Sequence, residues 1–205
     1  GIAAEVIPHG LPPERYPLGR GEGGYAAFVG RFSREKGVAD ALDAAHAAKV
    51  PIQLGGRAHP MDADYYRDQV APRLERPGVR WFGEVGHEGK VRILGNAAAT
   101  LFPIAWEEPF GLVMVESMLC GTPVVAYPHG SVPEVVEEGV TGFFVEDTKG
   151  MADRLNELVS GRLRFDRKRC RAAAVARFGV ERMVSGYLGL YSATIARRLP
   201  RVEAR

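Results

Sequence analysis

The chain has 205 residues, of which 46% are hydrophobic and 25% charged, a composition typical of a soluble globular protein with room for one sizeable core. A formal net charge of +2 is low for a nucleic-acid-binding domain, so no nucleic-acid partner is expected. Cys120 and Cys170, the only cysteines, provide neither a disulfide framework nor a Cys-x-x-Cys metal pair. With no signal peptide and no apolar run of membrane-spanning length, the sequence favours a cytoplasmic protein.

Residues 1–24 have the composition of a connecting segment. The sequence "GIAAEVIPHGLPPERYPLGRGEGG" passes from a short apolar piece into proline, glycine and charged residues. We therefore expect this segment to be an incoming strand and a linker that follow another domain of a longer chain.

From residue 25, short apolar runs alternate with helical patterns. Strands are expected at "YAAFVG" (25), "PIQLGG" (51), "VRWFGE" (79), "ATLFPI" (99), "PVVAY" (123) and "GFFVE" (142), with helices near 37–48, 62–74, 88–96, 110–119, 132–138 and 148–159. Strands that are apolar at nearly every position predict an α/β fold over residues 25–165, a Rossmann-like parallel sheet with helices on both faces. Ligands of such folds bind beyond the carboxyl ends of the strands.

Residues 166–205 are expected to be helical and to contain a long terminal helix. Its apolar side chains fall on one face, formed by Met183, Tyr187, Leu190, Tyr191 and Ile195. We interpret the basic cluster before it as a solvated helix face, with peripheral contact to a membrane surface as the alternative. This cluster contains one acid, Asp166, and the cations Arg162, Arg164, Arg167, Lys168, Arg169 and Arg171.

The segment "FVGRFSREKG", residues 28–37, is the first candidate site. Gly30 follows a strand, and Arg31 and Lys36 precede a helix, so backbone amides and two cations would surround an anion. If this loop is considered alone, Arg31 and Lys36 are slightly better explained as solvated surface charges than as an anion-binding site. Neither GxxxxGK[ST] nor GxGxxG is present, so the standard phosphate-binding loops are excluded.

The segment "WEEPFGLVMVES", residues 106–117, is the second candidate. Pro109 is expected in the first turn of a helix that starts directly after a strand. The amides of Gly111, Leu112 and Val113 would then face a ligand above the sheet, where the helix dipole favours a phosphate.

Two glutamates accompany this helix. Glu116 falls on an apolar stripe with Leu112 and Leu119, where a carboxylate is costly unless a donor hydrogen-bonds it. Glu108 lies at the mouth of the expected site. The alternatives are a first-turn acid that complements the dipole for Glu108 and a core-edge residue for Glu116.

Two other motifs have simpler interpretations. His129, in the loop after the fifth expected strand, is an ordinary loop histidine when taken alone. Asp62-x-Asp64 imitates a metal-binding DxD motif, but Asp62 is better explained as a helix N-cap and Asp64 as a first-turn acid. No metal site is expected.

Three segments together resemble the carboxy-terminal half of glycosyltransferase family 4: "GRFSREKG", "EEPFGLVMVESMLCGTPVVA" and "PHGSVPEVVEEGVTGFFV". The resemblance covers residues 5–195, and Glu-Pro-Phe-Gly followed by the second glutamate is its most specific part. It implies a retaining, metal-independent hexosyltransferase with the GT-B fold of two facing Rossmann-like domains. Its donor would be a UDP-sugar or GDP-sugar, with no further cofactor.

The resemblance also implies roles for individual residues. Arg31 and Lys36 would neutralise the diphosphate beside Gly30, and the amides of residues 111–113 would meet phosphate and sugar oxygens. Glu108 would face the sugar hydroxyls, and Glu116 would accept from the ribose diol, which explains a half-buried carboxylate. The best single contact to the base, in the loop "GEVGHEGK", would be Val85.

The sequence departs from the family pattern in places. His9 stands where the family has Asn, and "HGSVPE" replaces Gly-Gly before Pro-Glu, so the roles of His9, His129 and Ser131 stay open. The acceptor-binding, amino-terminal domain would be the partner of this half, which we expect to transfer no sugar alone. The alternatives are a non-catalytic nucleotide-binding module and another GT-B enzyme of the sucrose- or glycogen-synthase type.

Overall fold

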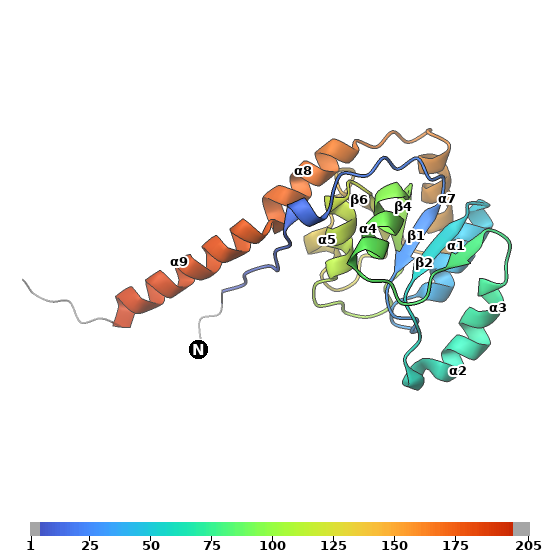
Figure 1. Ribbon diagram of the computed structural model, residues 1–205, viewed down its shortest axis with the longest axis horizontal. Coiled ribbons are helices and arrows are strands. Elements are labelled where there is room, and N and C mark those ends of the chain that lie inside the picture. The colour runs from blue at the N-terminus through green and yellow to red at the C-terminus, as the bar shows by residue number, and fades with distance from the viewer. Residues whose placement is uncertain (1–4, 199–205) are drawn as a thin grey trace, which may run out of the picture.

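The computed structural model describes residues 5–198 and is built on one parallel sheet (Figure 1). The sheet has six strands in the order β3-β2-β1-β4-β5-β6. All six expected strands are present: β1 (Ala26–Val29), β2 (Ile52–Gly55), β3 (Val79–Trp81), β4 (Ala99–Phe102), β5 (Val124–Ala126) and β6 (Gly142–Phe144). The expected Rossmann-like α/β fold is therefore confirmed. The strand order reverses between β1 and β4, which is the switch point where such folds bind ligands.

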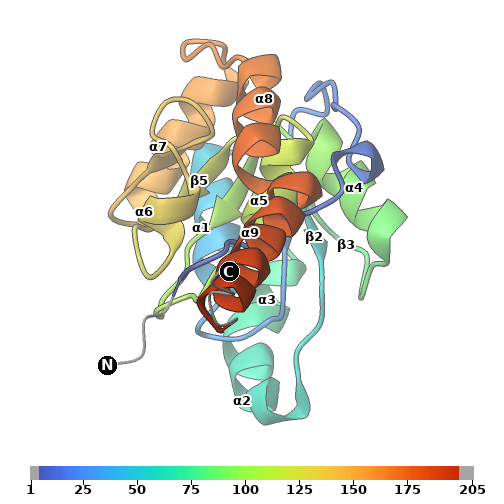
Figure 2. The same cartoon turned by 90° about the vertical axis from the view of Figure 1, so that its left-hand side faces the viewer.

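Helices cover both faces of the sheet, because alternate residues of each strand point to opposite sides. Phe28 of β1 belongs to a core with α1 (Val38–Ala48) and α7 (Thr148–Val159), whereas its neighbour Ala27 belongs to a second core with α4 (His87–Asn96) and α5 (Leu112–Leu119). Figure 2 shows α7 and α4 on opposite sides of the sheet. Strands buried on both faces explain the nearly continuous apolar runs in the sequence.

The helix expected over residues 62–74 is interrupted. It consists of the 3-10 turn η2 (Pro60–Asp62), the short α-helix α2 (Ala63–Tyr65), the π-helical turn η3 (Tyr66–Val70) and the short α-helix α3 (Ala71–Leu74). Pro72 cannot donate to the preceding turn, so a regular α-helix cannot continue through it. Asp62 occupies the N-cap position of α2, as expected, but its side chain makes no capping hydrogen bond and lies 3.8 Å from the Arg31 guanidinium. The capping side chain in this region is His59, whose ring accepts from the Met61 amide at the start of η2.

The helix after β4 starts later than expected. Helix α5 begins at Leu112, and Pro109 lies in the preceding loop rather than in the first turn. Gly111, at the N-cap, has a φ of +75°, a conformation that favours glycine and turns the chain into the helix. Helix α6 (Val132–Val135) starts where expected but ends earlier than the predicted range of 132–138.

The C-terminal region contains two helices, α8 (Arg167–Phe178) and α9 (Val180–Arg198), and α9 extends away from the sheet (Figure 1). They are separated where Leu11 accepts from the Val180 amide and donates to the carbonyl of Phe178. Within the described part of the N-terminal segment, that bridge and the 3-10 turn η1 (Pro13–Arg15) replace the expected strand, whose residues 1–4 lie outside the described range.

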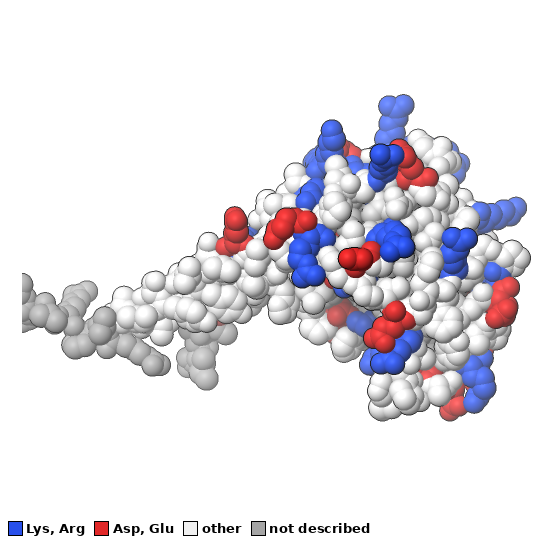
Figure 3. Space-filling model, in the orientation of Figure 1, with Lys and Arg blue, Asp and Glu red and all other residues white. Residues whose placement is uncertain are grey.

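The apolar face expected on the terminal helix is largely uncovered. Tyr187, Tyr191 and Ile195 are 42%, 57% and 58% exposed. Val184 and Leu188, which the expected face did not include, are exposed as well and lie beside it on the helix, so the exposed apolar face is wider than expected. Figure 3 shows few charged side chains along α9. Over residues 5–198, none of the helices combines the length and apolarity that a membrane span requires.

The basic cluster before α9 is not simply a solvated face. The Arg167 side chain donates to the carbonyls of Gly19, Gly95, Ala97 and Cys120 and to the Thr122 hydroxyl. Arg171 donates to the carbonyls of Pro13, Tyr16 and Leu119. The sequence interpretation is therefore wrong for these two arginines, which bind the N-terminal segment to α8 and to the helix ends of the second core.

Candidate functional site

Two adjoining cavities lie beyond the carboxyl ends of the central strands. The larger, of about 530 Å³, lies over the ends of β1 and β2, and the smaller, of about 170 Å³, lies between β1 and the start of α5. Val29 and Gly30, at the end of β1, line both. Glu116 lines neither cavity. The predicted residues divide between them: Arg31 and Val85 line the larger, and Lys36, Glu108, Gly111, Leu112 and Val113 line the smaller.

Glu108 is buried in the smaller cavity and is held by two donors. The Lys36 ammonium and the Trp106 indole N–H both bond its Oε2, the latter at 3.0 Å. Lys36 also lies 5.2 Å from the centroid of the Trp106 ring, within cation–π range. Among the described residues no donor bonds Glu108 Oε1. The carboxylate therefore has one oxygen fixed by the protein and one available to a ligand.

The first turn of α5 supplies unpaired donors to the same cavity. No hydrogen bond in the described part of the chain uses the amides of Gly111, Leu112 and Val113, as is normal for a first helical turn. Leu112 is 46% exposed, so this end of the helix is open to solvent. Free amides, the helix dipole and the Lys36 ammonium make the smaller cavity suitable for an anionic group.

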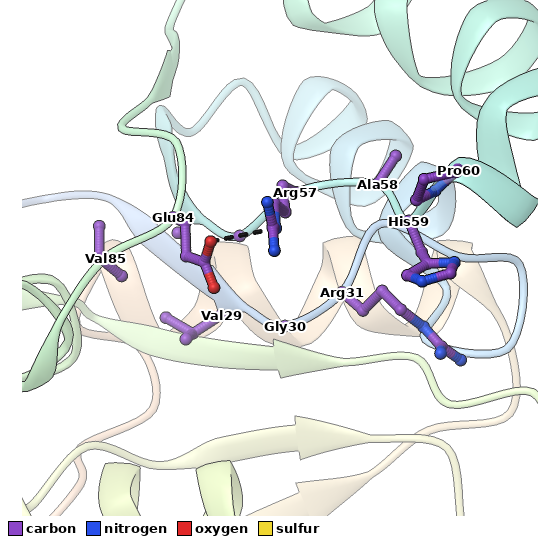
Figure 4. Close-up of a pocket in the computed structure, with 11 residues that line it drawn as sticks. Val29, Gly30, Arg31, Arg57, Ala58, His59, Pro60, Glu84 and Val85 are labelled. Atoms are coloured by element: carbon purple, nitrogen blue, oxygen red, sulfur yellow. Dashed lines mark ion pairs between the residues drawn. The ribbon is translucent and has the colours of Figure 1, made fainter.

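The larger cavity is lined by charged side chains that already have partners (Figure 4). Arg57 and Glu84 form an ion pair of 3.0 Å beside Val85, and both side chains are mostly exposed. At the other end of the cavity, Arg31 bonds Glu35 at 2.6 Å. Arg31 lines only the larger cavity and Lys36 only the smaller one, so the two cations do not share a cavity. Both follow Gly30, which lines the two cavities where they meet.

Glu116 is buried as expected, but the protein itself supplies its partners. The Lys90 ammonium and the Tyr16 hydroxyl both donate to Oε1. Burial and the adjacent carboxylate raise the pKa of the Tyr16 phenol, which keeps it a donor. The prediction that Leu112 shares a buried apolar stripe with Glu116 and Leu119 is wrong, because Leu112 faces solvent while the other two residues are buried. A ribose is therefore not needed to explain the burial of this carboxylate.

The loop after β5 packs directly behind Glu108. The Ser131 amide donates to the Glu108 carbonyl at 2.8 Å, and a side chain at Gly130 would meet the Glu108 backbone nitrogen at 2.3 Å. A glycine is thus required at the closest approach. His129 is exposed, and His9 packs edge-on against Phe110, with ring centroids 5.0 Å apart. Within residues 5–198, no group of three or more His, Cys, Asp or Glu side chains could hold a metal ion.

Sequence reasoning missed three features of this region: the Lys90 partner of Glu116, the Trp106 partner of Glu108, and the Arg57–Glu84 pair. Trp106 had a local signal, since an indole directly precedes the two acids of the "EEPFG" segment. Lys90 and Arg57 had none, because their partners lie far away in the sequence.

A family model described as glycosyl transferases group 1 matches residues 17–177, most of the chain. The chain belongs to this family. Among curated group 1 relatives, it is 36% identical over 170 residues to alpha-maltose-1-phosphate synthase of Mycolicibacterium smegmatis, a match that covers 78% of this chain and 43% of that protein. The chain thus spans less than half of the length of this relative.

Solved glycosyltransferase structures share the fold. AviGT4, a glycosyltransferase of avilamycin A biosynthesis, superposes with a TM-score of 0.76 at 28% identity, over 96% of this chain and 60% of that chain. HepE of Anabaena, crystallised with UDP, gives a TM-score of 0.81 at 24% identity, over 92% of this chain and 57% of that chain. At that identity the second likeness supports the fold alone.

Proposed function

We propose that this group 1 glycosyltransferase chain is the donor-binding, carboxy-terminal domain of a retaining family 4 enzyme with the GT-B fold. The full-length protein would transfer a hexose from a nucleotide diphosphate sugar to an acceptor. The observation that supports this most directly is the smaller cavity, which combines the Lys36 ammonium, the Glu108 carboxylate and three unpaired amides at the start of α5.

Each group has a distinct part in the proposed reaction. The diphosphate would lie over Gly30, at the junction of the two cavities, with the sugar in the smaller one and the base beside Val85 in the larger. As the glycosidic C–O bond breaks, negative charge develops on the departing diphosphate, and the Lys36 ammonium and the α5 amides would stabilise it. Glu108 would accept hydrogen bonds from the sugar hydroxyls through Oε1.

Ligand binding would give Lys36 a second anionic partner. The ammonium is paired with Glu108, and the indole of Trp106 bonds the same carboxylate oxygen. A diphosphate carries more negative charge than the carboxylate and can share the ammonium with it. Because these fixed donors already face the diphosphate, donor binding would need no divalent metal.

The base is proposed to be uracil, with guanine as the alternative. HepE, a fold neighbour, has been crystallised with UDP and with UDP-glucose. The acceptor would bind mainly to an amino-terminal domain, so this chain alone would bind donor but transfer no sugar. Transfer of a hexose by the purified chain would contradict this part of the proposal.

Calorimetry with UDP and UDP-glucose tests the assignment of Glu108. In Glu108→Ala, binding of UDP should be unchanged or tighter, because the Lys36 ammonium loses its competing partner. Binding of UDP-glucose should fall below that of the parent chain, on the order of tenfold for a lost charged hydrogen bond. Glu107→Ala, which removes an exposed acid from the adjacent position, is the matched control.

Two outcomes would contradict the proposal. If the parent chain binds neither UDP nor GDP, it is not a donor-binding domain for these nucleotides. If Glu108→Ala binds UDP and UDP-glucose as the parent does, Glu108 does not face the sugar, and a non-catalytic nucleotide-binding module becomes the better description.

A further inference from the structure

We infer that Lys90 and Tyr16 are positioning residues for ribose recognition, because they fix Glu116 by one oxygen and leave only Oε2 for the ligand. The inference rests on the proposed function, since it assumes that a nucleotide diphosphate binds across the two cavities. It assigns roles to two side chains that reach Glu116 from separate parts of the chain.

The contacts of Glu116 are one-sided. Both protein donors, the Lys90 ammonium and the Tyr16 hydroxyl, bond Oε1. Within the described part of the chain, no donor bonds Oε2. The Glu116 side chain is 8% exposed and that of Lys90 is 27% exposed, so the pair is largely removed from water. A buried carboxylate with one unused oxygen retains capacity to accept from a hydroxyl group.

The position of the pair suits a ribose. Glu116 is one helical turn after Leu112, which lines the smaller cavity. Lys90 lies in the first turn of α4, shortly after Val85, which lines the larger cavity. The Lys90–Glu116 pair therefore connects the two helices next to the cavities that would hold the base and the diphosphate. In a nucleotide, the ribose lies between those two groups.

Lys90 allows Glu116 to remain ionised where it is buried and close to the expected phosphates. A buried carboxylate without a cation is strongly unfavourable, and a nearby phosphate would repel it further. The Lys90 ammonium compensates the charge, while the Tyr16 hydroxyl adds a second donor to the same oxygen. Oε2 then needs no reorientation to accept from a ribose hydroxyl, which limits the entropy lost on binding.

Tyr16 is itself held in place. Its carbonyl accepts from Arg171 of α8, and its ring packs edge-on against His87 with centroids 5.0 Å apart. The N-terminal segment is thus attached to the ribose-recognition residue through one phenol. Tyr16→Phe removes only the hydroxyl and keeps the packing.

A comparison of two ligands separates positioning from direct contact. The 205-residue chain would first be titrated with UDP, GDP and ADP, and the tightest ligand then compared with its 2′,3′-dideoxy form. We expect Lys90→Met to weaken the normal diphosphate about tenfold and the dideoxy form by less than about threefold. Tyr16→Phe should show a smaller loss of the same kind, and Lys90→Arg should recover most of the affinity. Lys149→Met removes an exposed, ion-paired lysine and is the charge-matched control.

Each other result has a definite meaning. An equal loss for both ligands would show that Lys90 contacts the phosphates, and no loss with a lower melting temperature would show a purely structural pair. Either result overturns the inference. If the parent chain binds the normal and dideoxy ligands equally, Glu116 does not read the ribose and the inference fails, although donor binding stands. If none of the three diphosphates binds, the proposed function fails as well.

Discussion

Replacing Arg167 by methionine tests whether a cation within a basic surface cluster is in fact structural. Its guanidinium donates to four carbonyls and one hydroxyl that belong to the N-terminal segment, the end of α4 and the turn after α5. Burial lowers the pKa of this guanidinium, as expected for a cation removed from water. Methionine keeps much of the length and apolar stem but donates to none of these groups.

The expected cost follows from the acceptors that lose their partner. The carbonyls of Gly95 and Cys120 also accept from the amides of Gly21 and Gly19. In contrast, within residues 5–198 the carbonyls of Gly19 and Ala97 have Arg167 as their side-chain donor and no backbone donor.

An unsatisfied buried acceptor costs about 1–3 kcal/mol, so the two orphaned carbonyls together cost about 2–6 kcal/mol. Because Gly19 is only half-buried and water can reach it, and because the buried charge is also removed, we expect the lower part of this range. The predicted destabilisation of Arg167→Met is therefore about 2–4 kcal/mol.

Urea unfolding followed by circular dichroism measures this quantity directly. For a chain of this size, the change corresponds to a fall in Tm of roughly 4–16 °C. Arg169→Met, two positions along α8, is the matched control, because Arg169 is exposed and the same charge is removed. If the two variants have the same unfolding free energy within about 0.5 kcal/mol, the structural role assigned to Arg167 is refuted.

Four other outcomes are expected. Lys36→Met should weaken binding of a nucleotide diphosphate about tenfold to a hundredfold and lower the melting temperature, because Glu108 loses its cation. Adding Glu108→Gln should restore the melting temperature but not the affinity. An unchanged titration would show that Lys36 is not part of the site. Burial raises the pKa of Cys120 to about 11 and that of Cys170 to about 12, so a thiol reagent at pH 8 should label neither cysteine in the folded chain and both in urea. Because raised thiol pKa values stabilise the fold below the unfolded-state pKa, stability should also decline as the pH rises above about 9. Finally, titration of UDP with and without a chelator should give the same affinity, and a large loss with the chelator would reveal a metal requirement.

The fold followed from the sequence because the signals for it are local. Six apolar runs separated by helical patterns predicted the parallel sheet, and a proline in the course of the second expected helix accounts for its interruption. The placement of Gly30, Lys36, Glu108 and the start of α5 around one cavity also followed, because the carboxyl ends of parallel strands meet at the same edge of the sheet. Hydrophobic periodicity and the parallel direction of the strands suffice for conclusions of this kind.

The partners of the charged side chains were decided only by the tertiary structure. Lys90 and Tyr16 lie 26 and 100 positions from Glu116 in the sequence, and Arg167 lies 148 positions from Gly19. No local pattern distinguishes an arginine that crosslinks three segments from its solvated neighbours in the same cluster. A carboxylate on the buried face of a helix indicates that a partner must exist, since an unpaired buried charge is too costly, but it does not say which residue that partner is. Its identity depends on which helices the fold brings together.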